Sequence, residues 1–513
     1  ERGCTRSPHT VALERGFSGV LAGFTELTIM PSNAALRHIY LHARCMDIQR
    51  GLCNGQEVRF EHTDAVQSLA LSDIHGHAQL KRDLFSATSQ GAEGELRISL
   101  PDHLRPERVS SGTEGNADGE EFSMMTIRID YVLEDVHEAI QVIQPTADAP
   151  YRVPHMYTRP LGLNSSRCWV PCLDSLWDRC TWELEYVVPR RLSVDMGDLD
   201  DETPEIYVIS SGELTEHAMH PQNPEKSVFY YTQQVATSVQ HVAFCAGPFV
   251  MTRLSPAGLQ TCETLSFCLP EHEHELRSTT QFAWQAIEYI SSEYGSYPFG
   301  SFKLVFVDGT HEDCHTASTL AICSSDLLHP PSVIDQAFEN RHILSHAVAF
   351  QWVGINIIQK TWADTWLIHG LSQYLASMFL RWLLGNNEYR FRMKKDCDRL
   401  CHWDIGMPPL YQAGRDEPLD PQLLSFVNLK APLVLYLLDR RLCKMGASLG
   451  LGRVIPKVFL QAITGEMSNN ALGTHSFLRT CKKVSSADLR LFMDQWINGS
   501  GCPRFICTAT VTR

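Results

Sequence analysis

Three histidines in the second half of the chain have the type and spacing that could hold a metal ion. His342 and His346 lie four residues apart, and His369 follows in a later segment. On an α-helix, residues four apart lie one turn apart on the same face, so both imidazoles could contact one ion. A zinc ion with three protein ligands can activate a bound water for hydrolysis. No carboxylate base is evident for such a site, so we favour the simpler interpretation that these histidines only make hydrogen bonds.

A second set of candidate ligands has a weaker pattern. Cys397, Cys401 and His402 are close in sequence, but the chain has 17 cysteines, and such sets then arise readily from packing. We therefore predict no bound metal and no cofactor.

The composition is that of a globular protein with more than one domain. The chain has 513 residues, 44% apolar and 20% charged, which is too long for one hydrophobic core. No apolar run reaches the ~18 residues of a bilayer span, and the first residues lack the apolar region of a secretory signal, so we expect no membrane association. The odd number of cysteines predicts reduced thiols in the cytosol or nucleus. The net charge of −15 argues against a general nucleic-acid coat.

The hydrophobic pattern changes near residue 265. Before it, short β-branched and aromatic segments such as MMTIRIDYVL (124–133) and WELEYVV (182–188) alternate as strands do. After about residue 270, long segments such as 334–354 and 363–385 carry apolar residues at helical spacing. We predict an α+β multidomain fold with an antiparallel β domain, a mainly helical domain and the start of another β domain. Their predicted bounds are 1–265, 266–500 and 501–513.

The segment that contains the histidines resembles the core of the zinc metalloaminopeptidases. In that family a His-Glu-x-x-His helix supplies two zinc ligands and the catalytic base, and a Glu from the next helix supplies the third ligand. The resemblance implies a saddle-like amino-terminal β domain and a thermolysin-like helical domain. It rests on residues that surround the ligand positions, here called the framing residues, and we interpret Trp352, Trp366, Leu367 and Tyr374 among them as core. They are Gln351, Trp352, Gly354, Trp362, Asp364, Trp366, Leu367, Gly370 and Tyr374.

The positions that carry the family's chemistry differ in this chain. His346 stands at the first ligand position, but Ala347 replaces the Glu base and Phe350 replaces the second His ligand. His369 stands in place of the third-ligand Glu, and Asn428 in place of a transition-state Tyr. The strand that holds the substrate's amino terminus in the family corresponds to CHTASTL (314–320), which has no Glu. Loss of the base alone removes roughly 10²–10⁴ in rate, so the resemblance implies an inactive homologue.

Other blocks narrow the resemblance to a non-enzymatic branch of the family. They include FKLVFVD (302–308), NNEYRFRMKKDCDRL (386–400) and KAPLVLYLLDRRL (430–442). These blocks resemble TBP-associated factors of the general transcription factor TFIID. The resemblance implies a nuclear scaffold in transcription initiation by RNA polymerase II. Its implied partners are other TFIID subunits, namely the largest and the eighth TBP-associated factors, and core-promoter DNA at the initiator.

A local excess of positive charge favours DNA contact. Residues 378–460 contain 13 Lys and Arg against 8 Asp and Glu, although the whole chain is acidic. Phosphate contacts need such side chains, and no motif for reading the major groove is present. The candidates for DNA contact are Arg390, Arg392, Lys394 and Lys395.

Two other functions stay open at this point. A divergent metalloaminopeptidase could use a relocated metal site built from His342, His346 and His369. A peptide-binding module could use the inert cleft without cutting. The missing Glu in 314–320 argues against the second, because the ammonium group of a peptide would lose its partner.

Overall fold

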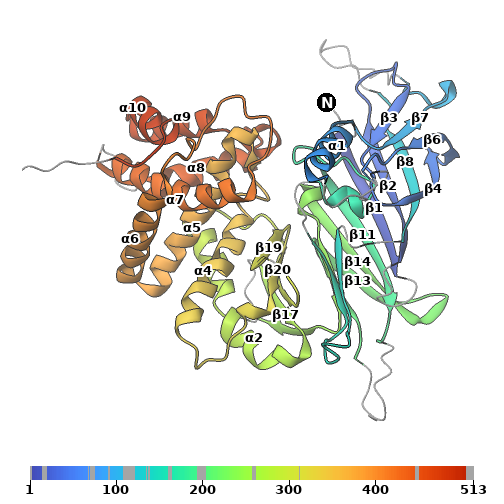
Figure 1. Ribbon diagram of the computed structural model, residues 1–513, viewed down its shortest axis with the longest axis horizontal. Coiled ribbons are helices and arrows are strands. Elements are labelled where there is room, and N and C mark those ends of the chain that lie inside the picture. The colour runs from blue at the N-terminus through green and yellow to red at the C-terminus, as the bar shows by residue number, and fades with distance from the viewer. Residues whose placement is uncertain are drawn as a thin grey trace, which may run out of the picture. The chain divides into compact units, whose positions relative to one another are not determined.

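The computed structural model describes most of the chain as two compact units (Figure 1). The first, here called the β unit, comprises Glu1–Arg253, Glu263–Ser278 and Phe299–Pro331. The second, here called the helical unit, comprises Leu254–Cys262, Thr279–Pro298 and Ser332–Arg513. The described residues are 3–13, 20–66, 69, 76–90, 93–107, 122–134, 136, 139–159, 164–192, 204–256, 262–310, 312–444 and 450–503.

The largest sheet of the β unit has the strand order β13-β14-β11-β1-β2-β8-β4-β5. Its neighbouring strands are antiparallel except β1 and β11, which pair in parallel. In β8, buried and half-buried residues alternate along MTIRIDYVL, so one face of the strand packs on the core. The strands are β1 (Gly3–Leu13), β2 (Leu21–Met30), β4 (Asp47–Cys53), β5 (Gln56–Glu57), β8 (Met125–Leu133), β11 (Arg179–Pro189), β13 (Glu213–His220) and β14 (Asn223–Ser238).

Two smaller antiparallel sheets pair further segments of the β unit. Their orders are β12-β15-β10-β9 and β3-β7-β6. The predicted antiparallel β architecture is therefore confirmed. The strands are β3 (His38–Leu41), β6 (Arg59–His62), β7 (Leu96–Ser99), β9 (Ile140–Ile143), β10 (His155–Thr158), β12 (Tyr207–Ser210) and β15 (Phe244–Gly247).

A five-stranded mixed sheet has the order β16-β17-β18-β20-β19. Its centre is parallel, and every residue of β18 is buried, as expected for a strand covered on both faces. The predicted boundary at residue 265 falls inside β17 of this sheet. The strands are β16 (Val250–Arg253), β17 (Glu263–Cys268), β18 (Ser301–Val307), β19 (Cys314–Ala317) and β20 (Leu320–Ser324).

A buried ion network joins loops and strands of the β unit. The Arg167 guanidinium lies 2.9 Å from Asp174 and 3.1 Å from Glu95, and Arg44 lies 2.8 Å from the same Glu95. These charges are almost fully removed from solvent, where removing one partner typically costs about 3–5 kcal/mol. The network therefore fixes the positions of three segments that are distant in sequence.

The helical unit is built around α5, which is apolar over most of its surface. Twelve of its residues are buried, because α4 and α7 pack against it. At Gly370 the approach of α7 is so close that a Cβ would lie 2.9 Å from the Cβ of Ala431. The helices of this unit are α3 (Ala283–Glu293), α4 (Asp335–Phe350), α5 (Thr365–Leu384), α6 (Asn386–Trp403), α7 (Pro421–Lys444), α8 (Leu451–Ile463), α9 (Thr474–Ser485) and α10 (Arg490–Phe492), with the short strands β21 (Ile358–Gln359) and β22 (Ala471–Leu472). Helix α2 (Glu273–Thr280) lies mostly in the β unit, which includes Glu263–Ser278.

One helix, α7, meets the length and composition of a membrane span, contrary to the expectation that no apolar run would. Core helices meet the same criteria. In this structure α7 packs on α5 and carries Lys430, whose ammonium pairs with Asp404 at 2.7 Å in a site closed to solvent. The apolar length of α7 is accounted for by this packing.

The sequence pattern does not predict α1 (His77–Gln90) within the β unit. Its segment is polar, and its large apolar side chains Leu84 and Phe85 are exposed. The predicted start of another β domain at 501–513 lies outside the described residues from 504 onward.

Candidate functional site

The site is formed by one face of α4, the first turns of α5 and the middle of α7. Helix α4 places His342, His346 and Phe350 on successive turns of one face, as their four-residue spacing requires. Ala347 is 1% exposed and contributes only a methyl group to the packing of α4. Helix α5 contributes His369. All of these residues lie in the helical unit, so the geometry of the site is fixed within one compact body.

The Phe350 ring packs against the rings of both histidines. Its ring centroid is 5.6 Å from that of His346, in an edge-on arrangement, and 5.6 Å from that of His369. The ring also covers Gly354, where a Cβ would lie 2.5 Å from three of the ring carbons. A phenyl group has no lone pair, so the side chain that contacts both histidines cannot bind a metal ion.

His346 makes a hydrogen bond that sequence reasoning missed. Its Nε2 lies 3.0 Å from the Ser372 hydroxyl, and that hydroxyl donates to the backbone oxygen of His369 at 2.9 Å. The serine has one proton, so when both bonds form, His346 Nε2 is the donor. Nε2 then has no lone pair for a ligand. Ser372 stands three residues after His369, a helical spacing that allows its hydroxyl to reach the His369 backbone oxygen but does not indicate the contact with His346.

Desolvation is the largest influence on all three imidazoles. It lowers the pKa of His342 and of His369 to about 4, and that of His346 to about 3. The neighbouring His369 and His342 lower the pKa of His346 further, because two charged rings would repel each other. The Arg392 charge also lowers the pKa of His342. The three rings are therefore neutral at neutral pH.

Asn428 lies beside His369, from the middle of α7. A side-chain hydrogen bond between them opposes the lowering of the pKa of His369 by desolvation. Its geometry is poor, because His369 Nδ1 and Asn428 Oδ1 are both buried without a partner of standard geometry. Asn428, which stands in place of the family's transition-state Tyr, thus lies next to His369 at the predicted third-ligand position.

The donor set does not fit a catalytic zinc ion. Among the described residues, the ligand atoms of His342, His346 and His369 are not grouped within 4.8 Å of one another. Phe350 packs against two of these rings. The Nε2 atom of His346 carries the proton that it donates to Ser372, so it has no free lone pair for a metal ion. Cys397, Cys401 and His402 also form no such group within the described chain. The group that does meet this distance is Glu271, His272 and Asp308 in the β unit, where Glu271 is exposed.

The framing residues have structural tasks that explain their positions. The Trp352 indole donates to the backbone oxygens of Gly295 and Ser296 at 2.9 and 3.1 Å. Asp364 accepts from the backbone of Thr361 at 3.2 Å, which caps the 3-10 turn Trp362–Asp364 that leads into α5, and from the backbone of Thr474 at 2.7 Å. The Trp366 indole donates to the Thr474 hydroxyl at 3.0 Å. The interpretation of Trp352, Trp366, Leu367 and Tyr374 as core residues is confirmed, because each is at most 5% exposed.

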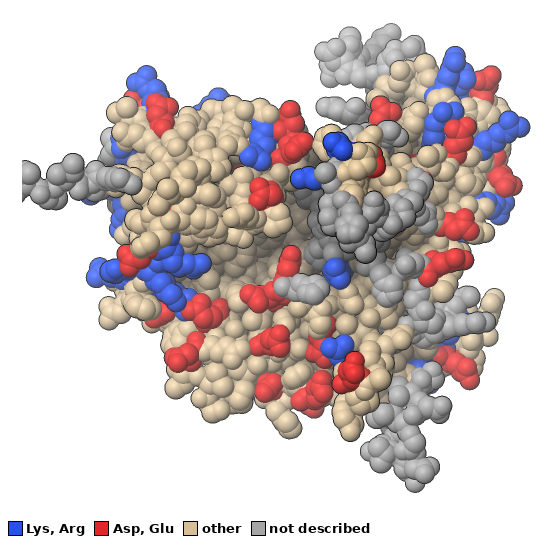
Figure 2. All heavy atoms as spheres, in the orientation of Figure 1, with Lys and Arg blue, Asp and Glu red and all other residues tan. Residues whose placement is uncertain are grey.

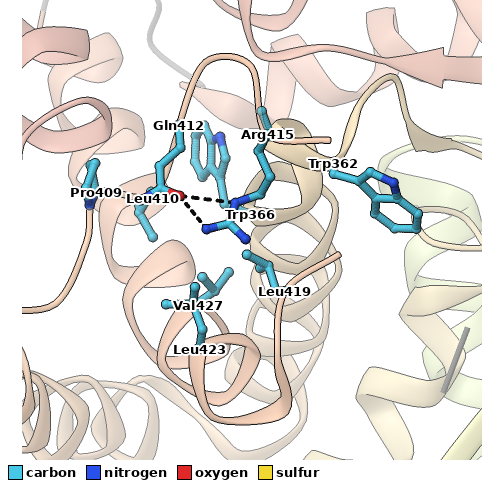
Figure 3. A pocket seen from close by; sticks show the side chains of 10 residues that line it. Trp362, Trp366, Pro409, Leu410, Gln412, Arg415, Leu419, Leu423 and Val427 are labelled. Atoms are coloured by element: carbon cyan, nitrogen blue, oxygen red, sulfur yellow. Dashed lines mark hydrogen bonds between the residues drawn. The ribbon is translucent and has the colours of Figure 1, made fainter. Parts of the chain in front are cut away.

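A shallow pocket lies beside these framing residues (Figure 3). Its walls are largely apolar, and the Arg415 guanidinium is held at its edge by the Gln412 side-chain oxygen. It encloses about 250 Å³, part of which is open to solvent. None of its described lining residues is a nucleophile or a general base. The lining residues are Trp362, Ala363, Trp366, Pro409, Leu410, Gln412, Arg415, Leu419, Leu423 and Val427.

The neutral histidines predict a dependence of stability on pH. The unfolded chain takes up protons on these rings as the pH falls through about 6.5, whereas the folded unit holds them neutral until about 4 or lower. The unfolded state therefore binds more protons in this window, and the free energy of unfolding falls as the pH is lowered from 6.5 toward 4. The expected loss by pH 5 is at most ~2 kcal/mol per ring, and less because each ring keeps some solvent contact.

Chemical denaturation at a series of pH values measures this effect. His369→Gln should flatten the pH dependence between 6.5 and 5, while His402→Gln, which changes an exposed residue of α6, should leave it unchanged. An equal slope in His369→Gln and the unchanged chain would contradict the assignment.

The chain is similar to known proteins in sequence and in structure. No family model matches the sequence. Proteins named transcription initiation factor TFIID subunit 2 match nearly the whole chain: that of Schizosaccharomyces pombe is 34% identical over 98% of the chain, and that of Drosophila melanogaster 28% over 96%. The chain covers 46% and 42% of these two proteins, so it spans about half the length of the curated relatives it matches.

Solved structures show the same fold in a hydrolase and in a zinc metallopeptidase. Leukotriene A4 hydrolase of Saccharomyces cerevisiae aligns with 99% of the chain and 69% of its own, with a TM-score of 0.68 and 14% identity. A zinc metallopeptidase of Deinococcus radiodurans aligns with 98% of the chain and 95% of its own, with a TM-score of 0.65 and 17% identity. At this identity the likeness establishes the fold alone. The chain is a homologue of TFIID subunit 2 along almost all of its own length, built on the fold of the zinc metallopeptidases.

Proposed function

We propose that this chain is a non-enzymatic, nuclear subunit of TFIID. In this role it is a scaffold that helps to assemble the complex and to engage core-promoter DNA for initiation by RNA polymerase II. Homology to TFIID subunit 2 supports the assignment to this complex. The peptidase-like fold supplies two packed units with extensive surface, which suits assembly interfaces of about 1,200–2,000 Å² or more.

The observation that carries the non-enzymatic assignment is the position of Phe350. Water activation needs a metal with an open coordination position and a base close to the bound water. Here a phenyl ring packs against both His346 and His369, and the residue that follows His346 is an alanine. The chain's own residues in this region can donate hydrogen bonds and fill space, but they cannot position a hydroxide for attack on a peptide bond.

The partners proposed for this subunit are other TFIID subunits, in particular the largest and the eighth TBP-associated factors. The β unit and the helical unit are each held rigid by buried polar contacts, which favours binding without large rearrangement. Rigid surfaces lose little conformational entropy on association, so more of the contact energy appears as affinity.

Promoter contact is proposed to involve the basic face of α6. Figure 2 shows Lys and Arg side chains gathered over this helix, with acidic side chains beside them. Arg392 pairs with Glu388 at 2.7 Å and with Glu339 at 3.2 Å, and Lys394 pairs with Asp398 at 2.6 Å. Two of the four predicted cations are thus partly neutralised by close acidic partners. Lys395 lies 3.9 Å from the Glu339 carboxylate, and Arg390 is exposed, so these two are left as the stronger candidates for phosphate contact.

Purified chain is expected to show neither aminopeptidase turnover nor stoichiometric zinc. Fluorogenic aminoacyl substrates and elemental analysis measure the two quantities. A variant that rebuilds ligands at the predicted positions, Phe350→His with His369→Glu, should bind zinc more tightly than the unchanged chain. Turnover by the unchanged chain, with zinc held by His342, His346 and His369, would instead establish the relocated metal site.

Affinity purification tests the proposed assembly. The tagged chain, expressed in the cells from which it comes, should recover other TFIID subunits, with the largest and the eighth TBP-associated factors among them. Trp366→Ala should reduce this recovery, because it removes a core side chain that is 1% exposed. An untagged chain is the control, and recovery without any TFIID subunit contradicts the proposal.

Titration of duplex promoter DNA at several salt concentrations tests the α6 face. Alanine at Arg390 and Lys395 should weaken binding and reduce the slope of log K against log salt by about 2, since each phosphate contact contributes ~0.9. Alanine at Lys482 and Lys483 of α9 removes the same charge elsewhere and should change the slope less. If both double variants have the same slope, α6 does not make the contact.

A further inference from the structure

Two cysteines of the β unit lie side by side across neighbouring strands. Cys314 in β19 is the register partner of Cys323 in β20, and their sulfur atoms are 3.3 Å apart. Neither is in a disulfide in this structure. The pair belongs to no site described above, and Cys314 begins the segment that lacks the ancestral Glu.

The hydrogen bonds of the two strands define the geometry of this pair. The backbone nitrogen of Ser324 donates to the oxygen of Asp313 at 3.0 Å, so residues 313 and 324 form a hydrogen-bonded pair. Such pairs alternate with non-hydrogen-bonded pairs, so Cys314 and Cys323 occupy a non-hydrogen-bonded position. Opposed Cα atoms are then about 4.5 Å apart, which lies within the range of about 4.4–6.8 Å that a disulfide requires.

The tip of this hairpin is held by a buried lysine. Lys303 is 4% exposed. Its ammonium donates to the Thr319 hydroxyl at 3.1 Å and to the Ser301 hydroxyl at 3.2 Å. The Thr319 hydroxyl also accepts from the backbone nitrogen of Gly212 at 2.9 Å. These contacts fix the turn between the two strands. The register that opposes the two thiols is therefore maintained without further ordering.

The two thiols differ in their access to solvent. Cys314 is half-buried at the edge strand of the five-stranded sheet, whereas Cys323 is fully buried. Burial raises the pKa of the Cys323 thiol well above its usual value, so this thiol keeps its proton. An oxidant from solvent would therefore meet Cys314 first, and Cys323 is placed to react with the product.

We propose that Cys314 and Cys323 form a site of reversible oxidative modification, in which a hydroperoxide converts the dithiol into a cross-strand disulfide. Cys314 Sγ attacks one peroxide oxygen, the O–O bond breaks, and a sulfenic acid and one water form. The Cys323 sulfur then attacks Cys314 Sγ, and its proton passes to the departing hydroxide as a second water. The two thiols lose two electrons and two hydrogens, and the peroxide is reduced to two waters.

Peptide mass spectrometry of the intact chain tests the site. Folded protein is treated with hydrogen peroxide, then denatured, alkylated with N-ethylmaleimide and digested with trypsin. Cleavage after Lys303 and Arg341 gives a peptide that contains Cys314 and Cys323 and no other cysteine. We expect this peptide to lose both alkylation sites together, to be lighter than the reduced peptide by two hydrogens, and to regain both sites after dithiothreitol.

Single variants and exposed thiols provide the controls. In Cys323→Ser, Cys314 should proceed to irreversible sulfinic acid, because no second thiol can rescue it. In Cys314→Ser, Cys323 should stay reduced and be alkylated after denaturation. Cys397 and Cys401 are exposed on α6 and report general oxidation of the chain. If these two are oxidised while the peptide with Cys314 and Cys323 keeps both alkylation sites, or carries only sulfinic acid in the unchanged chain, the proposal is wrong.

Discussion

The hydrogen bonds that start and brace α5 are the constraint on which the helical unit depends. Asp364 is 4% exposed, and its two carboxylate oxygens are satisfied by Thr361 and by the backbone of Thr474. A buried acceptor or indole without these partners would cost about 1–3 kcal/mol or more. Trp366 adds a second link to Thr474 from the next turn. Because α4 and α7 both pack on α5, the position of this one helix determines the arrangement of the others.

This constraint separates the residues that hold the fold from the residues of the candidate site. The framing residues Trp352, Asp364 and Trp366 satisfy buried polar groups and fill the core, so the fold requires them whether or not a metal is bound. His346 and Phe350 take no part in these contacts, because His346 bonds to Ser372 and Phe350 packs against the two histidine rings. The helices that would position a catalytic site can therefore persist after the site itself has gone.

Much of the architecture could be predicted because periodicity reports burial directly. The alternation in β8 and the apolar surface of α5 each indicate the correct element, and Trp352, Trp366 and Tyr374 are core as predicted. The polar helix α1 could not be predicted, because it has no apolar stripe. The local sequence pattern also cannot show that the β unit continues past residue 265. This follows from the pairing of β17 with β18, which are separated by more than 30 residues in sequence.

The site was predictable in its residue types and not in its contacts. The resemblance to the metalloaminopeptidases implies that His346, Phe350 and His369 lie close together, and the ring distances agree with this. The role of Ser372 depends on one rotamer and one shared proton, neither of which is encoded in spacing. The opposition of Cys314 and Cys323 follows from strand register, which a sequence without its turn geometry does not specify.

Gly354 has a consequence for how such a site can change over time. Its φ of +139° and the missing Cβ leave a hollow directly against the side chain at position 350. A bulky aromatic ring can settle there without displacing any backbone. With the Phe350 ring in this place, any residue larger than glycine at position 354 would clash with it. The residue types allowed at positions 350 and 354 therefore depend on each other. The space beside Gly354 therefore accommodates an aromatic ring at position 350 without steric cost. A substitution at Gly354 would then require that Phe350 be replaced by a smaller residue first.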